Sequence, residues 1–252
     1  MADQDLPVLD HLAELRKRII IVLVAVAMVM VVFYSRFHLL VEFLLEPVSR
    51  FKLDIAFFSL TEGFTTRLKL STIASIIVNS PLILFQAAAF INPGMTKREK
   101  KILYSAVVSI SLFFIGGALF GYFVLFPNVI YFLISYSQSY MMATLSGDRY
   151  FSFIGVFCLI MGGIFVIPLV LVFLGKLEML SYRILKKSRL PVFFAVLAVV
   201  GTVMPVLDFF TLGLTAAPIL LLLEISIWVV FFMERGRKKA LEEGKYNAPG
   251  EG

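Results

Sequence analysis

Charged residues are scarce in this chain, and cysteine and histidine are scarcer still. Only 16% of the 252 residues are Asp, Glu, Lys or Arg, against about a quarter in an average soluble domain. The single cysteine, Cys158, excludes a disulfide within the chain. The two histidines, His11 and His38, lie on either side of a long apolar run and cannot share a metal ion. A soluble domain and a disulfide framework are therefore both excluded.

Catalytic signatures are missing as well. The sequence has no HExxH, no GxSxG and no phosphate-binding P-loop, so nothing indicates a zinc peptidase, a serine hydrolase or a nucleotide hydrolase. The net charge of +6 does not indicate nucleic-acid binding, because the basic residues flank apolar runs as topology signals do. We expect no enzyme activity, no cofactor, no metal site and no nucleic-acid partner.

Long apolar runs dominate the chain instead. Sixty per cent of the residues are hydrophobic, and about 20 apolar residues suffice to cross a bilayer as a helix. The sequence predicts an all-α integral membrane protein with six transmembrane helices, over residues 19–33, 68–91, 102–126, 151–174, 190–204 and 209–233. We expect Pro127 to end the third helix. Helices five and six are short, and the fifth spans only where the bilayer thins around it.

The placement of Lys and Arg predicts the topology. Most of them lie in four segments: the N-terminus, the loops after the second and fourth runs, and the C-terminal tail. By the positive-inside rule both termini are cytoplasmic, in an N-in/C-in arrangement. We expect residues 1–233 to form one six-helix domain in the cytoplasmic membrane, and residues 234–252 to be a charged, disordered tail.

The two longer outer loops have too much apolar and aromatic character for simple linkers. Residues 37–45 form an amphipathic pattern that ends near Pro47. The segment 127–150 carries repeated aromatics with little charge. We expect two short interfacial helices here, which cap the outer side of the bundle.

Two acids stand among bases at the predicted cytoplasmic surface. Glu14 precedes Arg16, Lys17 and Arg18, and Glu99 lies between Arg98 and Lys100. One interpretation is that each acid is solvated and merely compensates its neighbours. The alternative is that the pair binds a ligand with two arginines, since a carboxylate accepts two parallel bonds from a guanidinium.

Few polar residues interrupt the apolar runs. Glu224 lies within the sixth run, where an ionisable group is usually functional or paired. Its position past the midpoint leaves open that it lies near the cytoplasmic end. Asn79 and Gln86 are seven residues apart and share a helix face, which favours hydrogen bonds between helices. Asp208 is placed to cap the sixth helix.

Two of these segments carry a family resemblance. HLAELRKR at 11–18 and SPLILFQAAAFINPGMTKREKK at 80–101 resemble the signatures of the TatC family, the receptor subunit of the twin-arginine protein translocase. Thr61-Glu62-Gly63-Phe64, Phe165-Val166-Ile167-Pro168 and Leu223-Glu224-Ile225 resemble further parts of that family's pattern. The resemblance covers nearly the whole chain and has the same six-helix plan.

The resemblance implies a function and a set of residues. Glu14 and Glu99 match the acids that bind the paired arginines of a signal peptide, and Phe90, Arg16 and Arg18 match the surface around them. Met204, Pro205 and Asp208 match the short-helix region implicated in docking of partners. The partners implied are twin-arginine signal peptides of folded proteins, TatB-like and TatA-like single-helix proteins, and further copies in a larger complex. Transport is then driven by the proton-motive force.

The sequence also departs from that family. Val166 stands where the fourth helix commonly has Glu, and Leu212 stands where the family has Gln. Another polar anchor, such as Glu224, would then have to serve a TatA-like helix. Two alternatives are a secondary transporter for small solutes or ions, which needs ionisable groups near the midplane, and a purely structural scaffold.

Overall fold

The computed structural model describes residues 6–49, 55–92, 95–137, 145–177, 179–203 and 209–246. The chain divides into two compact units, Met1–Val166 (unit 1) and Ile167–Gly252 (unit 2). The single six-helix domain over residues 1–233 stays a prediction. Apart from one pair of parallel strands, each two residues long, the described regular structure is helical.

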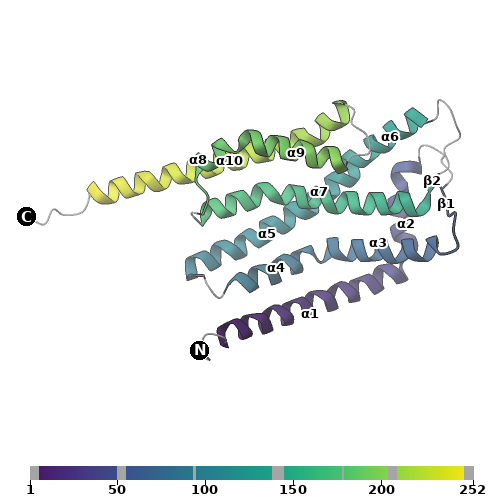
Figure 1. Ribbon diagram of the computed structural model, residues 1–252, viewed down its shortest axis with the longest axis horizontal. Coiled ribbons are helices and arrows are strands. Elements are labelled where there is room, and N and C mark those ends of the chain that lie inside the picture. The colour runs from purple at the N-terminus through teal and green to yellow at the C-terminus, as the bar shows by residue number, and fades with distance from the viewer. Residues whose placement is uncertain are drawn as a thin grey trace, which may run out of the picture. The chain divides into compact units, whose positions relative to one another are not determined.

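Unit 1 is built from long helices with short elements at one end (Figure 1). In chain order it contains α1 (Leu6–Ser35), α2 (Phe37–Ser49), β1 (Ile55–Ala56), α3 (Glu62–Val78), α4 (Ser80–Ile91), α5 (Lys97–Phe120), the π-helix η2 (Gly121–Leu125), α6 (Phe126–Ser137), β2 (Leu145–Ser146) and the first part of α7 (Gly147–Lys176). α1 lies along both α3 and α4, and α4 packs on α5. The predicted all-α class is confirmed for these elements.

The second predicted helix is not straight. α3 and α4 meet at Asn79 with a bend of 58°. Pro81 has no N–H to donate to the carbonyl of Ile77, so the helical ladder breaks there. Asn79 donates its side-chain amide to the Ser75 carbonyl at 2.8 Å, within its own helix and not between helices as expected.

The prediction that Pro127 ends the third helix is wrong. The helix passes through η2 into α6, and the apolar stretch Lys97–Leu133 is continuous. The wider π-turn lets the Phe126 N–H bond to the Gly121 carbonyl five residues back, next to the proline that cannot donate. Asn128 donates its side-chain amide to the Val124 carbonyl. The second interfacial helix expected from 127–150 is thus the continuation of α5.

The first interfacial helix is confirmed as an element, and it runs past Pro47 to Ser49. Pro47 leaves the Phe43 carbonyl without its helical donor. The Tyr122 hydroxyl donates to that carbonyl instead, and the Tyr150 hydroxyl donates to the Leu44 carbonyl at 2.6 Å. The two tyrosines therefore attach α2 to η2 and α7 and satisfy the carbonyls that the proline disturbs.

Further polar contacts join the segments at this end of unit 1. β1 and β2 pair in parallel, with Ile55 opposite Leu145. The Asp148 carboxylate accepts bonds from the Lys69 ammonium at 2.8 Å and from the Thr66 hydroxyl at 2.9 Å. α7 is thereby fixed to α3 where both helices begin.

Glycines bring α5 and α7 into close contact. A Cβ at Gly117 would lie 2.6 Å from the Phe165 Cβ and 2.8 Å from the Met161 carbonyl oxygen, and one at Gly121 would lie 3.0 Å from the Met161 side chain. Small residues four apart let helix backbones approach closely in lipid. The core of unit 1 is formed around this contact by Leu70, Leu125, Phe126, Ile154, Phe157 and Met161.

Unit 2 contains the last part of α7 with α8 (Tyr182–Lys187), α9 (Arg189–Val203) and α10 (Phe209–Tyr246). α9 and α8 both pack on α10, around a cluster of Leu185, Ile227 and Val230. α9 has 15 residues, as predicted for the fifth helix. α10 continues to Tyr246, through strong helix formers such as Ala240, Leu241 and Glu242, and the disordered tail over residues 234–252 stays a prediction.

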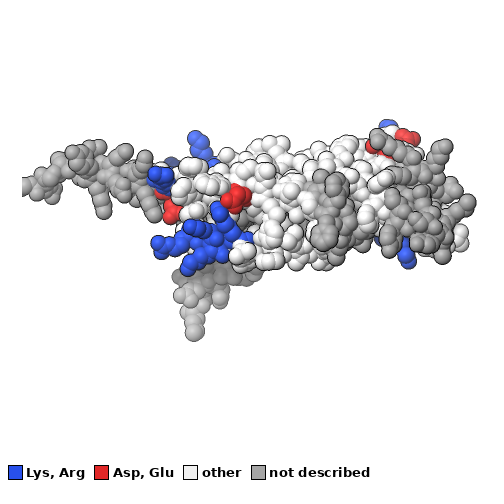
Figure 2. All heavy atoms as spheres, turned by 90° about the horizontal axis from the view of Figure 1, so that it is seen from above, with Lys and Arg blue, Asp and Glu red and all other residues white. Residues whose placement is uncertain are grey.

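The surface of both units is that of a membrane protein. Within the described residues four helices are long and apolar enough to cross a bilayer, or five if α3 and α4 form one bent span. Large apolar side chains such as Leu23, Val31 and Leu112 are more than 60% exposed, which soluble proteins avoid over contiguous areas. On the face in Figure 2, Lys and Arg gather toward one end, and wide areas carry no charge. The full count of six spans and the N-in/C-in topology stay predictions.

Neighbouring glycines on α5 test the close contact with α7. We expect Gly117→Val to lower the melting temperature of the purified protein, because its Cβ would overlap the Phe165 side chain and the Met161 carbonyl. Overpacking of this kind costs about 1–3 kcal/mol or more. Gly116→Val is the matched control, since a Cβ there meets nothing within 4 Å. Equal melting temperatures for the two variants would contradict the described packing.

Candidate functional site

The carboxylate of Glu14 is held by an arginine one turn further along α1. The Arg18 Nε lies 3.2 Å from Glu14 Oε1, and the Arg18 Nη2 donates to the same oxygen. The other oxygen, Oε2, is 3.9 Å from the His11 Nδ1. Residues four apart lie on one face of a helix, so the sequence alone permits this pair. Glu14 thus already binds one guanidinium in the absence of any ligand.

Arg18 also joins α1 to α4. Its Nη1 donates to the Gln86 Oε1 at 3.2 Å, and the Arg18 side chain is only 23% exposed. The expectation that Gln86 forms a hydrogen bond between helices is confirmed. One guanidinium therefore has two acceptors, one charged on α1 and one neutral on α4.

Phe90 lies beside Glu14 through a stacked histidine. The rings of Phe90 and His11 are 4.2 Å apart between centroids and 18° from parallel. His11 is three residues before Glu14 and is half exposed. The structure thus brings Glu14, Arg18, Gln86, Phe90 and His11 into one cluster, which we call the arginine cluster. Arg16 is exposed on the same end of α1.

Glu99 lies in the first turn of α5 and forms a capping box with Thr96. The Glu99 Oε2 accepts from the Thr96 N–H at 2.7 Å and from the Thr96 hydroxyl at 2.8 Å, and the Glu99 N–H donates to that hydroxyl. The N-terminal end of a helix stabilises a negative charge there. Both bonds go to Oε2, so Oε1 receives none from the described residues and is available to a ligand.

Glu14 and Glu99 lie at the same end of unit 1. The start of α1, the end of α4 and the start of α5 meet there in Figure 1. α4 is fixed to α5 by the Asn92 amide, which donates to the Tyr104 hydroxyl at 3.1 Å, and by contact of the Phe85 and Tyr104 rings.

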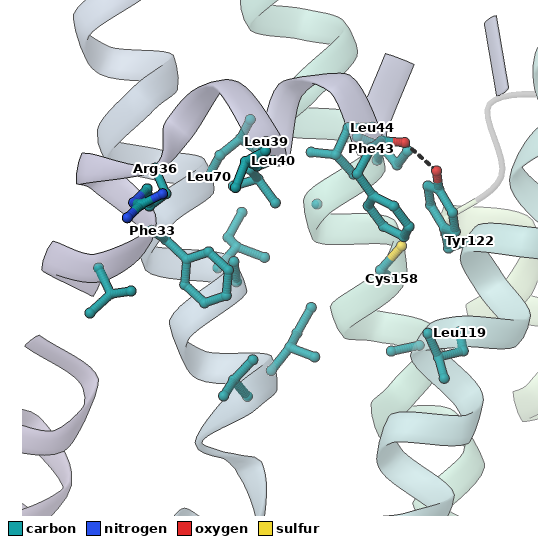
Figure 3. Close-up of a pocket in the computed structure, with 18 residues that line it drawn as sticks. Phe33, Arg36, Leu39, Leu40, Phe43, Leu44, Leu70, Leu119, Tyr122 and Cys158 are labelled. Atoms are coloured by element: carbon teal, nitrogen blue, oxygen red, sulfur yellow. Dashed lines mark hydrogen bonds between the residues drawn. The ribbon is translucent and has the colours of Figure 1, made fainter. Parts of the chain in front are cut away.

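An apolar groove of about 530 Å³ lies toward the other end of unit 1. Figure 3 shows Phe33 of α1, Leu70 of α3 and Leu119 of α5 around it, with Tyr122 and its bond to α2 at one side. The lining is apolar apart from a few groups such as Arg36. The groove offers room for an apolar ligand, and its described lining contains no Asp or Glu.

Glu224 is paired within unit 2. Its Oε1 is 2.8 Å from the Arg189 Nη2 and accepts from the Trp228 indole N–H at 3.1 Å. Arg189 is the first residue of α9, and the pair thus lies near the α8 side of the α9–α10 hairpin. Glu224 is not a lone ionisable group in a span, which removes the main support for the solute-transporter alternative.

Other residues predicted from the sequence to be functional have no observed role in the structure. Met204, Pro205 and Asp208, predicted to dock partners, lie outside the described residues, so the predicted cap of the sixth helix is also untested. Val166 is a half-buried apolar side chain where the resembling family commonly has an acid. The groups of three or more acids, histidines or cysteines that a metal needs are not found among the described residues.

Comparison with known proteins decides the family. The profile of the Sec-independent protein translocase protein (TatC) family matches residues 10–218. The chain belongs to the TatC family. The TatC protein of Carboxydothermus hydrogenoformans is 32% identical over 234 residues, covering 93% of this chain and 96% of that relative. The chloroplastic TATC of Pisum sativum is 35% identical over 231 residues, covering 90% of this chain and 65% of the relative.

Solved structures agree with this assignment. A crystal structure of the twin-arginine translocase receptor TatC in DDM is similar with a TM-score of 0.76 at 31% identity, over 87% of this chain and 98% of that chain. The chain is accordingly a membrane component of a Sec-independent protein translocase, and the expectation that it is not an enzyme is confirmed by the TatC family.

The structure adds His11 to the residues that the sequence indicated. The sequence contained His11 in the HLAELRKR segment but indicated no contact for its side chain. Its spacing of three residues from Glu14 was the available signal, but its contact with Phe90 depends on how α1 packs on α4. The hydrogen bond from Arg18 to Gln86 could not be predicted either, because it also depends on how α1 packs on α4.

The capping box at Glu99 can be tested by removing one hydroxyl. We expect Thr96→Val to weaken the first turn of α5, because loss of an N-cap side chain costs about 1 kcal/mol. Faster amide hydrogen exchange at residues 98–100 measures this effect. Thr96→Ser keeps the hydroxyl and should exchange like the unchanged protein. Unchanged exchange in Thr96→Val would show that the hydroxyl does not hold this turn.

Proposed function

We propose that this TatC-family chain is the receptor that binds the paired arginines of a signal peptide on folded cargo, between Glu14 and Glu99. The observation that carries the proposal is the guanidinium of Arg18 on Glu14. The chain's own arginine occupies this acid in the same way that an arginine of the cargo would. A second acid, Glu99, stands at the same end with one oxygen available.

The two acids then have different tasks. A first cargo arginine binds Glu99 through Oε1 without displacing any group. A second cargo arginine takes Glu14 from Arg18. Gln86 continues to accept from the Arg18 Nη1, so the displaced guanidinium keeps a partner within the partly buried cluster. This exchange avoids leaving a charged group without hydrogen bonds, which is costly when it is buried.

The apolar part of a signal peptide suits the groove in unit 1. Val32, in the groove lining, lies 14 residues after Arg18 on the same helix, which corresponds to about 21 Å. An apolar helix of that length, following the arginines, reaches from the acids to the groove. The groove is apolar over nearly all of its lining.

The remaining parts of the proposal concern orientation and partners. By the positive-inside rule, the basic segments favour a cytoplasmic location for both termini and the two acids. Signal-peptide binding there is followed by recruitment of TatB-like and TatA-like single-helix proteins, in a complex with further copies of the chain. The region 204–208 and Glu224 are the candidates for contact with these helices, because Val166 offers no polar group.

Neutral variants of the two acids test the binding site. We expect Glu14→Gln and Glu99→Gln each to weaken binding of a twin-arginine peptide roughly ten- to a hundredfold, since each removes one charge-assisted bond. Glutamine still completes a capping box, so Glu99→Gln should leave α5 intact. Titration of a labelled peptide onto the purified protein in detergent measures the affinity.

Two controls make this test decisive. Glu42→Gln removes an exposed acid of α2, at the other end of unit 1, and should leave affinity unchanged. A peptide with two lysines should bind weakly to every variant, because an ammonium cannot form the two parallel bonds of a guanidinium. Undiminished binding by the double variant would exclude Glu14 and Glu99 as the site.

Arg18 gives a prediction of opposite sign. We expect Arg18→Gln to bind the twin-arginine peptide several-fold more tightly, because the cargo arginine no longer competes with an internal one for Glu14. Arg18→Lys should bind the peptide with the affinity of the unchanged protein or a slightly higher one. Weaker binding by Arg18→Gln would show that Arg18 contacts the peptide directly and is not displaced.

A further inference from the structure

A second groove, in unit 2, is unrelated to the arginine cluster. It has a volume of about 570 Å³ and lies between the end of α7, α8, α9 and α10. Its walls are mostly leucine and isoleucine, among them Leu171, Leu185, Leu220 and Ile227. The polar residues in its lining are Ser188, Arg189 and Glu224. It is therefore an apolar groove with a polar rim.

The polar rim carries an incompletely bonded guanidinium. Arg189 uses its Nη2 on the Glu224 carboxylate at 2.8 Å. Its Nε is buried and has no hydrogen-bond partner among the described residues. A guanidinium can bind one acid through one edge and a second anion through its remaining donors. Arg189 therefore has donors left for an additional oxygen acceptor at the rim.

More positive charge lies next to this rim. The short helix α8 carries Arg183, Lys186 and Lys187, all exposed, and none forms an ion pair with a described residue. Together with Arg189 they outnumber the single acid Glu224 of the groove. Trp228, half exposed on α10, donates to Glu224, and tryptophan is typical of the level of the lipid headgroups. The rim is therefore positive and interfacial.

We infer that this groove binds one anionic glycerophospholipid of the surrounding bilayer. An acyl chain lies along the leucine and isoleucine walls. The phosphate accepts from the accessible donors of the Arg189 guanidinium, whose side chain is 38% exposed, and the α8 cations supply the attraction that favours an anionic over a zwitterionic headgroup. Basic pockets between membrane helices are known to select anionic lipids in this way.

The size of the groove favours a lipid over a partner helix. A helix is about 10 Å across, so 570 Å³ would hold only about five of its residues. A single acyl chain has no side chains and is far narrower. The lipid would also compensate for the shortness of α9. This helix is about 22 Å long, less than the roughly 30 Å apolar core of a bilayer. A lipid fixed at its basic end would fill the adjoining space.

Native mass spectrometry of the full chain in detergent tests the inference. The probes are phosphatidylglycerol and phosphatidylcholine with identical acyl chains, added at equal concentration. We expect one phosphatidylglycerol to be retained in preference to phosphatidylcholine. The exposed pair Lys186→Gln/Lys187→Gln should weaken retention of phosphatidylglycerol about tenfold or more, and the pair Lys97→Gln/Lys101→Gln, which removes the same charge from α5, should not.

A second variant tests the acyl-chain site and does not touch the ion pair. Val192→Trp fills the groove and should reduce retention of both lipids, whereas Phe194→Trp, on an exposed position of the same helix, should not. Equal retention of the two lipids by the unchanged protein, or full retention by Val192→Trp, would overturn the inference. So would a photo-crosslinker at Leu190 that captured a protein helix instead of lipid. Peptide binding at Glu14 and Glu99 is expected to be unchanged in the α8 and α9 variants, so the two proposals fail independently.

Discussion

Helices surrounded by lipid gain little by hiding apolar side chains from one another, because the lipid is equally apolar. Association must come from close backbone approach and from polar bonds. Unit 1 shows both: Gly117 and Gly121 bring α5 against α7, and polar bonds are concentrated at the two ends of the helices. At one end these bonds are made by Tyr122, Tyr150 and Asp148. At the other end they build the arginine cluster.

The same constraint explains why the arginine cluster is small and contains one carboxylate and one guanidinium. Each charged group in or near lipid needs a partner, and the arginine cluster provides Arg18 with two. A site that always keeps its guanidinium partnered can exchange one arginine for another at little electrostatic cost. In the proposed exchange, specificity for arginine follows from the geometry of the acceptors and not from an excess of negative charge.

Much of the fold could be predicted from apolar runs, and the exceptions have a common cause. These apolar runs correctly predicted the long helices, the helix α2 and the short helix α9. The predicted helix ends and bends were wrong at prolines, because sequence alone does not show which group replaces the missing N–H. Asn79 and Pro81 bend one span, whereas Pro127 lies in a helix that a π-turn carries onward. For the site, motifs indicated Glu14, Glu99 and Phe90, but the bond from Arg18 to Gln86 depends on tertiary register.

The π-helix η2 also sets the rotation of everything after it. Buried residues in this region recur every four positions, at 117, 121, 125 and 129 and again at 118, 122, 126 and 130. On a regular α-helix that period would drift by about 40° at each step, and the buried stripe would turn away from α7. The wider turn cancels part of the drift. Deleting one residue from η2 would remove the wide turn, and the buried positions would then recur at spacings of four, three and four residues, which a regular α-helix keeps on one face.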